Sequence, residues 1–251
     1  MRLVTYNVHS CVGTDNRLDV ARVADVIAAL RADIVCLQEL DVGRARTGGV
    51  DQAAAIAEHL KMRSRFHPAM FVREEQYGDA ILTALPNRIV KAGALPTVNL
   101  PGLEPRGALW LDIEAPSPAG GPPLQIINTH LGLVPREQRA QAAALLGPDW
   151  FEAARGRGPL LIVGDMNAPP TSSVYRALRR RLLDVQLPVN GTRMLATFPS
   201  TFPMLRIDHV FASPGVHVRR VWVAADPLTR RASDHLPLIV DFDLTGAEPA
   251  A

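Results

Sequence analysis

Six short apolar segments of this chain each end in a cluster of polar residues. The clusters are Tyr6-Asn7-Val8-His9, Leu37-Gln38-Glu39, Asn128-Thr129-His130, Gly164-Asp165-Met166-Asn167, Ile207-Asp208-His209 and Ser233-Asp234-His235. Ligand sites in sheet proteins gather at strand ends, where loops present side chains above a rigid base. Six clusters rich in Asp, Glu, Asn and His therefore predict a single shared site.

The oxygen-bearing members of these clusters are suited to bind a hard cation. Glu39, Asp165 and Asp234 offer carboxylates, whereas Asn7 and Asn167 offer amide oxygens. Mg²⁺, Mn²⁺ and Ca²⁺ prefer oxygen ligands of this kind. Zinc is disfavoured, because the sequence contains neither a Cys-x-x-Cys pair nor a His-Glu-x-x-His motif.

The histidines add groups that can move protons or stabilise an anion. His130 and His235 are the two candidates, and Asp208 is placed to fix the tautomer of a histidine. All basic side chains except Lys61 and Lys91 are Arg, whose planar fork suits phosphate, although coding bias explains that excess more simply. A hard cation, a His–Asp pair and an Arg-rich surface together indicate hydrolysis of a phosphate ester.

The segment Gly164 to Asn167 has a spacing with a specific meaning. Residues i and i+2 of an extended segment point to the same face, so Asp165 and Asn167 are expected to face one substrate. Met166 is then expected to point back into the core. Gly164 leaves room for a close approach of another backbone segment.

Apolar runs predict the strands that must position these residues. They cover residues 3–6, 33–37, 80–85, 108–113, 124–127, 160–163, 207–211, 218–223 and 238–242. Helical spacing predicts helices over 20–30 with Asp19 as N-cap, over 51–60, over 136–151, and over 173–182 with Thr171 or Ser172 as cap. Because helices and strands do not alternate strictly, the pattern favours an α/β fold of two packed mixed β-sheets with helices outside.

The amino-acid composition limits the classes of protein to which this chain can belong. The chain has 251 residues, of which 47% are hydrophobic, and this excludes global disorder. Two cysteines, Cys11 and Cys36, exclude a disulfide scaffold and favour a reducing compartment.

Neither a signal peptide nor an 18-residue apolar run is visible, so we expect a cytoplasmic protein without a transmembrane segment. We also expect a monomer. One domain over residues 1–245 is expected, followed by a frayed tail over 246–251.

The six clusters, together with the segments His9 to Asp15, Tyr77 to Leu82 and Glu104 to Leu109, resemble the endonuclease/exonuclease/phosphatase superfamily. The resemblance is closest to its bacterial branch of metal-dependent hydrolases and runs from residue 7 to residue 237. It implies a deoxyribonuclease-I-like fold, a four-layer α/β/β/α sandwich. Two positions depart from the pattern: Asp79, where Asn is commoner, and Asn16, where Gly is commoner.

The resemblance also implies roles for individual residues. Those that hold Mg²⁺ or Mn²⁺ are Glu39, Asn7 and Asp234, and those that position the attacking water and the scissile phosphate are Asp165 and Asn167. The resemblance makes His235, oriented by Asp208, the histidine that activates water or stabilises the phosphorane. It gives His130 a contact with phosphate or the protonation of the leaving oxygen, and Arg106 a contact with phosphate.

Three hypotheses remain open for the substrate. The first is a small-molecule or lipid-derived phosphodiester, with Phe198, Phe202, Met204 and Leu205 as an apolar wall or a peripheral lipid contact. The second is a nuclease acting on DNA or RNA, for which the run Arg179-Arg180-Arg181 could follow a phosphate backbone. A net charge of +2 and an aromatic content of 5% argue against it. The third is a non-catalytic binding protein on the same fold.

Overall fold

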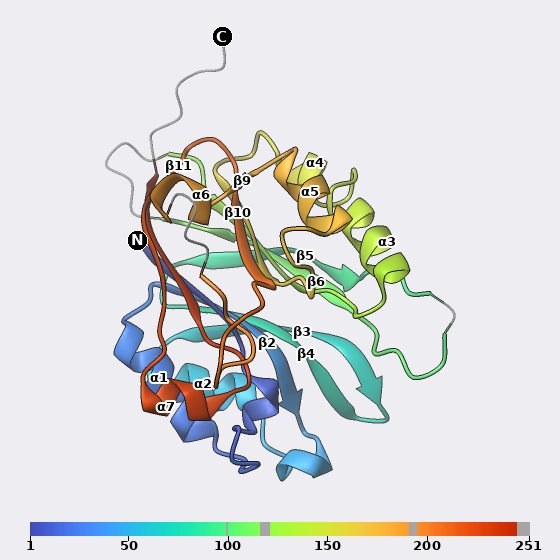
Figure 1. Ribbon diagram of the computed structural model, residues 1–251, viewed down its shortest axis with the longest axis vertical. Coiled ribbons are helices and arrows are strands. Elements are labelled where there is room, and N and C mark those ends of the chain that lie inside the picture. Colours follow the sequence, from blue (N-terminus) through green and yellow to red (C-terminus); the bar gives the residue numbers. More distant parts are fainter. Residues whose placement is uncertain (99, 116–120, 191–194, 245–251) are drawn as a thin grey trace.

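The apolar runs form two six-stranded sheets that pack face to face (Figure 1). This computed structural model describes residues 1–98, 100–115, 121–190 and 195–244, so the tail predicted over 246–251 lies outside the described part. The first sheet has the order β11-β12-β1-β2-β4-β3, and the second has the order β5-β6-β7-β8-β10-β9. Parallel and antiparallel pairs occur in both sheets, as the sequence predicts.

Each sheet consists of six strands. The first sheet contains β1 (Arg2–Asn7), β2 (Ile34–Val42), β3 (Arg63–Val72), β4 (Glu75–Thr83), β11 (Val216–Val223) and β12 (Leu238–Leu244). The second contains β5 (Asn87–Ala94), β6 (Gly107–Ile113), β7 (Leu124–His130), β8 (Leu160–Asp165), β9 (Leu183–Asp184) and β10 (Asp208–Ala212).

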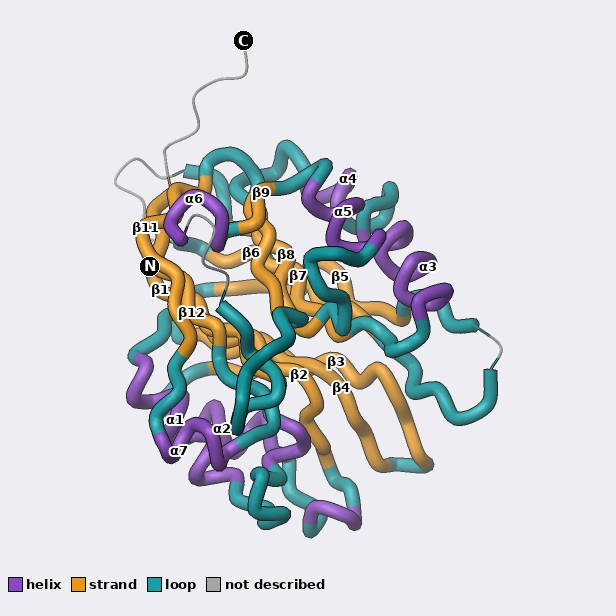
Figure 2. Tube along the Cα trace, viewed as in Figure 1, coloured by secondary structure: helices purple, strands orange, loops and turns teal. Residues whose placement is uncertain are grey.

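Helices cover the outer face of each sheet, which completes the predicted α/β/β/α layers (Figures 1 and 2). On the first sheet lie α1 (Val20–Leu30), α2 (Gln52–Leu60) and α7 (Pro227–Ala232), and on the second lie α3 (Pro135–Leu145), α4 (Phe151–Ala154) and α5 (Ser173–Arg179). The remaining helix, α6 (Gln186–Asn190), contacts β11, and two short 3-10 turns are η1 (His9–Cys11) and η2 (Ala45–Thr47).

The core explains why the strands have continuous apolar sequences. Leu3 of β1 belongs to the cluster between the sheets, whereas its neighbour Val4 packs under the helices of the first sheet. Strands covered on both faces have apolar residues at consecutive positions instead of alternating ones. No helix in the described part of the chain is long and apolar enough to cross a bilayer.

Several element boundaries differ from those the sequence predicts. The helix predicted over 136–151 is two helices, because α3 ends at Leu145 and the chain turns through Gly147 before α4. The helix predicted over 173–182 ends at Arg179; Ser172 is its N-cap and accepts the Tyr175 N–H at 3.0 Å. The strands over 63–72 and 87–94 are not predicted, because they are partly exposed and have no apolar run.

Strand order brings the polar clusters to one end of the molecule. Asn7 at the end of β1 pairs with Gln38 of the parallel strand β2, and His130 at the end of β7 pairs with Asp165 of the parallel strand β8. Antiparallel β10 begins with Asp208, which pairs with Asp165. Each sheet therefore presents its polar residues at the same edge of the sandwich.

Candidate active site

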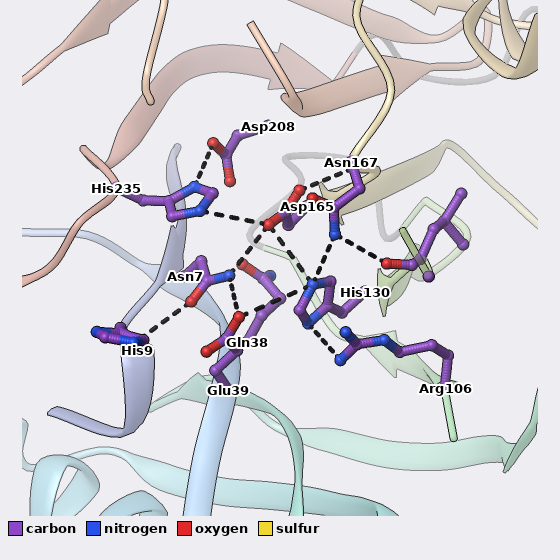
Figure 3. Close-up of polar contacts among 12 residues, drawn as sticks. Asn7, His9, Gln38, Glu39, Arg106, His130, Asp165, Asn167, Asp208 and His235 are labelled. Atoms are coloured by element: carbon purple, nitrogen blue, oxygen red, sulfur yellow. Dashed lines mark hydrogen bonds and ion pairs between the residues drawn. The ribbon is translucent and has the colours of Figure 1, made fainter. Parts of the chain in front are cut away.

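A cavity of about 480 Å³ opens at this edge, between the two sheets. Seven of the residues predicted for the site line it, namely Glu39, Arg106, His130, Asp165, Asn167, Asp234 and His235. The other two predicted residues, Asn7 and Asp208, are buried and bond to side chains of the cavity. Figure 3 shows how these groups other than Asp234, from distant parts of the sequence, point toward one another.

A β-bulge directs Glu39 into the cavity. The register between β2 and β4 shifts between Leu37 and Leu40, and Glu39 has a left-handed backbone with φ of 62°. Bulges re-aim a side chain in this way and often lie beside active sites. The Glu39 carboxylate accepts a hydrogen bond from Asn7 Nδ2 at 2.9 Å.

Asp79 of β4 lies behind this bulge, at one of the positions where the sequence departs from its relatives. Its buried carboxylate accepts a hydrogen bond from the backbone N–H of Glu39. Burial raises the pKa of Asp79 to about 7, against the opposing effect of the nearby Arg106. Asp79 is therefore only partly ionised at neutral pH.

Asp165 occupies the centre of the polar network. Its Oδ2 accepts a hydrogen bond from Asn7 Nδ2 at 3.0 Å, and its Oδ1 accepts one from the Asn167 N–H at 2.8 Å. Burial, together with the neighbouring Asp208, raises the pKa of Asp165 to about 7. A carboxylate with that pKa can take up a proton near neutral pH.

The residues around Asp165 bear out two of the sequence expectations and correct the reason for a third. Met166 is fully buried, as predicted, and a Cβ on Gly164 would lie 1.8 Å from the carbonyl oxygen of Thr129. Asn167 does line the cavity with Asp165, but its φ of 46° shows that a turn, not an extended segment, places it there.

His130 is surrounded by nitrogen donors. Arg106 Nη1 lies 3.1 Å from its Nδ1, and Asn167 Nδ2 lies 3.0 Å from its Nε2. Burial, the Arg106 charge and the charge of His235 lower the pKa of His130 well below its ordinary value. His130 is therefore neutral at pH 7, and Nε2 lies 3.6 Å from Asp165 Oδ2.

Carboxylates, rather than nitrogen donors, surround His235. Its Nδ1 lies 2.9 Å from Asp208 Oδ2, so the predicted pairing of these two residues is present in the structure. Burial lowers its pKa, but the charge and hydrogen bond of Asp208, with Asp165 and Asp234 nearby, outweigh burial and raise the pKa to about 10. The ring of Phe198 packs against the imidazole, with 4.8 Å between the ring centroids. His235 is therefore an imidazolium at neutral pH.

The two other predicted residues that line the cavity are Arg106 and Asp234. Arg106 is buried, bonds to the Tyr77 hydroxyl and forms an ion pair with Glu104 at 3.3 Å. Asp234 lines the cavity and accepts a hydrogen bond from Ser233 Oγ at 3.3 Å, but among the described residues no bond joins it to Glu39.

The sequence did not identify Tyr77 and Arg46, which also line the cavity. Tyr77 falls within a segment that resembles the family, yet the segment alone gives it no role. Arg46 follows β2 in the short turn η2, and a single Arg in such a turn carries no signal. Only the fold places it beside Tyr77.

Two groups of side chains could hold a cation. Glu39 Oε1 and Asp165 Oδ2 accept from the same Asn7 nitrogen, so two acidic oxygens share one small space, as hard divalent cations require. The second group, Asp165, Asp208 and His235, brings its ligand atoms within 4.8 Å of one another. In that group the Nδ1 atom of His235 is hydrogen-bonded to Asp208 Oδ2 at 2.9 Å, which leaves Nε2 as the ring nitrogen that could bind a cation. The residues therefore fit Mg²⁺ or Mn²⁺ at Glu39, provided that the Asn7 amide turns its oxygen inward.

The sequence is similar to a known protein family and to a bacterial protein. The sequence matches the pattern of the Endonuclease/Exonuclease/phosphatase family over residues 4–235. It is 25% identical to the uncharacterized protein YbhP of Escherichia coli strain K12, over 97% of this chain and 96% of the relative.

Solved structures share the fold. An endonuclease/exonuclease/phosphatase structure from Beutenbergia cavernae superposes with a TM-score of 0.80 at 25% identity, over 99% of this chain and 72% of the other. The mannosyl-6-phosphatase Bt3783 of Bacteroides thetaiotaomicron superposes with a TM-score of 0.77 at 22% identity, over 97% of this chain and all of the other.

Proposed function

This chain belongs to the endonuclease/exonuclease/phosphatase family, and on that premise we propose that it is a metal-dependent phosphoesterase. Its favoured reaction is hydrolysis of a phosphodiester, from a small molecule or a lipid, by in-line attack of water. The observation that supports this proposal is the arrangement around Asp165. A shared acidic site, a neutral histidine held by Arg106, and a charged histidine held by Asp208 meet in one cavity.

We assign the metal-binding role to Glu39, Asn7 and Asp234. Glu39 and Asn7 are in contact, and Asp234 reaches the same cavity from the segment before β12. A bound Mg²⁺ or Mn²⁺ would neutralise the negative charge that develops on the phosphate or on the leaving oxygen.

The remaining residues divide proton transfer from charge stabilisation. Asp165 accepts the proton of the attacking water, and Asn167 holds the water and the scissile phosphate beside it. The His235 imidazolium, oriented by Asp208, stabilises the charge of the phosphorane and donates its proton to the leaving oxygen as the bond from that oxygen to phosphorus breaks. Neutral His130 and cationic Arg106 contact the phosphoryl oxygens from the opposite wall.

The alternatives have less support. Arg179, Arg180 and Arg181 lie at the end of α5, on the outer face of the second sheet, and do not line the cavity. A nuclease would use them only for remote backbone contacts. The mannosyl-6-phosphatase is by its name a monoesterase, but at 22% identity it shares only the fold. The complete polar network argues against a non-catalytic binding protein.

One screen tests the proposed function. Bis-4-nitrophenyl phosphate, 4-nitrophenyl phosphate, DNA, RNA and phospholipids are assayed on one preparation with Mg²⁺ or Mn²⁺, and again with excess EDTA. We expect metal-dependent cleavage, faster for the bis-ester than for the monoester. Faster cleavage of the monoester would indicate a phosphatase, and full activity in EDTA would contradict the metal assignment.

A further inference from the structure

The outer wall of the cavity carries an arginine that the proposed mechanism does not use. Arg46 lies in η2 and lines the same cavity as Arg106 and His130. Its side chain is 47% exposed, so the guanidinium is accessible from the cavity.

A buried carboxylate fixes the orientation of this guanidinium. Asp41, which is fully buried, accepts hydrogen bonds from Arg46 Nε and Nη2, both at 2.7 Å. Nη2 also donates to Ser10 Oγ at 3.1 Å, whereas Nη1 has no hydrogen-bond partner among the described residues. Arg44 Nη1 lies 3.8 Å from the same carboxylate, and Arg44 Nε pairs with Glu75 at 3.4 Å. Among the described residues, Nη1 is therefore the nitrogen of the Arg46 guanidinium that remains free to donate to a ligand in the cavity.

The turn that carries Ser10 is strained. His9, Ser10 and Cys11 have φ values of 47°, 50° and 59°, three successive left-handed residues without a glycine. Gln52 Nε2 holds the Ser10 carbonyl at 2.7 Å, and Arg46 holds its hydroxyl. Strain of this kind persists where the surrounding structure enforces it, and it gathers at ligand sites. Because Ser10 Oγ accepts from Arg46, its own hydroxyl hydrogen is free to donate into the cavity.

Tyr77 connects this wall to the residues expected at the scissile phosphate. The Arg46 guanidinium lies over the Tyr77 ring, 5.5 Å from its centroid, and the Tyr77 hydroxyl bonds to Arg106. Arg106 in turn contacts His130. The two arginines therefore flank one buried tyrosine, and each faces the same cavity.

We propose that Arg46 and Ser10 form a second anion subsite, which binds a phosphate group of the substrate other than the one that is hydrolysed. This inference rests on the proposed function and narrows its substrate class to phosphodiesters that carry a further phosphate. Guanidinium and hydroxyl donors fixed before binding are the groups that recognise phosphate. Glu104 lines the same cavity, pairs with Arg106 at 3.3 Å and also interacts electrostatically with Arg46.

The test compares two chromogenic substrates with the same scissile bond. One is thymidine 5′-(4-nitrophenyl phosphate), and the other is the same compound with a 3′-phosphate. We expect the wild-type protein to have a kcat/KM about tenfold higher for the 3′-phosphorylated compound, mainly through KM. In Arg46→Gln the ratio of the two kcat/KM values should fall to about one. Arg155→Gln, which removes an exposed Arg outside the cavity, is the matched control and should keep the wild-type ratio.

A binding measurement separates this inference from the proposed function. Calorimetric titration with thymidine 3′,5′-bisphosphate and with thymidine 5′-monophosphate should show tighter binding of the bisphosphate, and Arg46→Gln should remove the difference. If Arg46→Gln does not fold because Asp41 loses its partner, the double variant Asp41→Asn/Arg46→Gln removes the buried charge as well.

The outcomes are distinct. Equal kcat/KM and equal affinity for the paired compounds in the wild type would overturn the subsite and leave the phosphodiesterase proposal intact. A preference that survives in Arg46→Gln would also overturn it. Tighter bisphosphate binding that depends on Arg46, without hydrolysis of either ester, would support the subsite and contradict the proposed function.

Discussion

His130 and His235 lie equally far from one carboxylate oxygen in the cavity, yet they differ in charge. Nε2 of His130 and Nε2 of His235 are each 3.6 Å from Asp165 Oδ2, and both rings are buried. Nδ1 of His130 faces the Arg106 guanidinium, whereas Nδ1 of His235 faces the Asp208 carboxylate. Burial lowers the pKa of both rings, and the carboxylates around His235, Asp208 first among them, outweigh burial only there.

This difference divides the cavity into two halves with separate tasks. The His130 half belongs to the second sheet and offers neutral and cationic donors to a phosphate oxygen. The His235 half joins the segment before β12 to β10 and holds a charged imidazolium beside Asp165. Pairs of titratable groups whose pKa values are pushed apart mark the acid and base partners of a reaction.

Removal of the charged histidine should have the largest effect. His235→Ala takes away the imidazolium beside Asp165, so we expect kcat for bis-4-nitrophenyl phosphate to fall about 10³-fold. Urea unfolding should show that the protein remains folded. A loss of less than about tenfold is below the usual contribution of an acid–base group. Such a result would contradict the role of the His235 imidazolium.

Removal of the donor behind His130 should come next. Arg106→Met deletes a cation expected at the phosphoryl oxygens, and the loss of one such donor reduces kcat about 10²-fold. The same change removes the positive charge that helps to keep His130 neutral, so the pKa of His130 should rise. Arg155→Met, outside the cavity, serves as the control. An unchanged pKa of His130 would refute the influence of Arg106.

Asp208→Asn should have a smaller effect than either. The amide cannot hold the imidazolium as the carboxylate does, and the loss of a residue that orients a functional histidine reduces activity about 10–100-fold. Because Asp208 and His235 act as one unit, the double variant Asp208→Asn/His235→Ala should be little slower than His235→Ala alone. Losses that multiply in kcat would refute the pairing.

His209, the residue next to Asp208, should affect stability alone. It packs between Tyr175 and Phe211 and donates from Nε2 to the Ala168 carbonyl at 2.8 Å. Burial, with the Arg206 charge, lowers its pKa to about 4, so the unfolded chain binds a proton at a higher pH than the folded protein. Its contribution to stability is present above about pH 6.5 and is lost as the pH falls toward 4.

Denaturant unfolding at several pH values checks this contribution. The free energy of unfolding should fall by about 2 kcal/mol between pH 7 and pH 5 on account of His209. His209→Gln should reduce that dependence while the activity ratio between substrates stays unchanged. The same pH dependence in His209→Gln would mean that another group is responsible.

The sequence predicted the parts of this molecule that depend on local pattern. The buried strands of both sheets followed from apolar runs, whereas the pairing of Asp208 with His235 was implied by the resemblance to the family. Contrary to the expectation that their clusters end apolar segments, Asp208 begins β10 and His235 precedes β12. The partly exposed strands β3 and β5 have no such run, and the break between α3 and α4 falls where apolar residues continue through a turn at Gly147.

Features that depend on tertiary neighbours could not be predicted. The bulge that turns Glu39 depends on the register between β2 and β4, and Arg46 reaches the cavity only because Asp41 and Ser10 hold it there. The opposite charges of His130 and His235 depend on side chains at sequence separations of 24 and 27 residues. Such contacts leave no periodic signal in the sequence.

An NMR titration of the histidine rings tests the central claim most directly. Imidazole signals are followed from pH 5 to pH 9 in EDTA and assigned with His130→Gln and His235→Gln. The account predicts that His235 remains protonated through pH 8.5, because its pKa is about 10. We expect His130 to lose its proton at a much lower pH than His235 and to be neutral at pH 7, because its pKa lies well below the ordinary value. Titration of both rings together near pH 6.5, or in the reverse order, would contradict the division of the cavity into a charged and a neutral half.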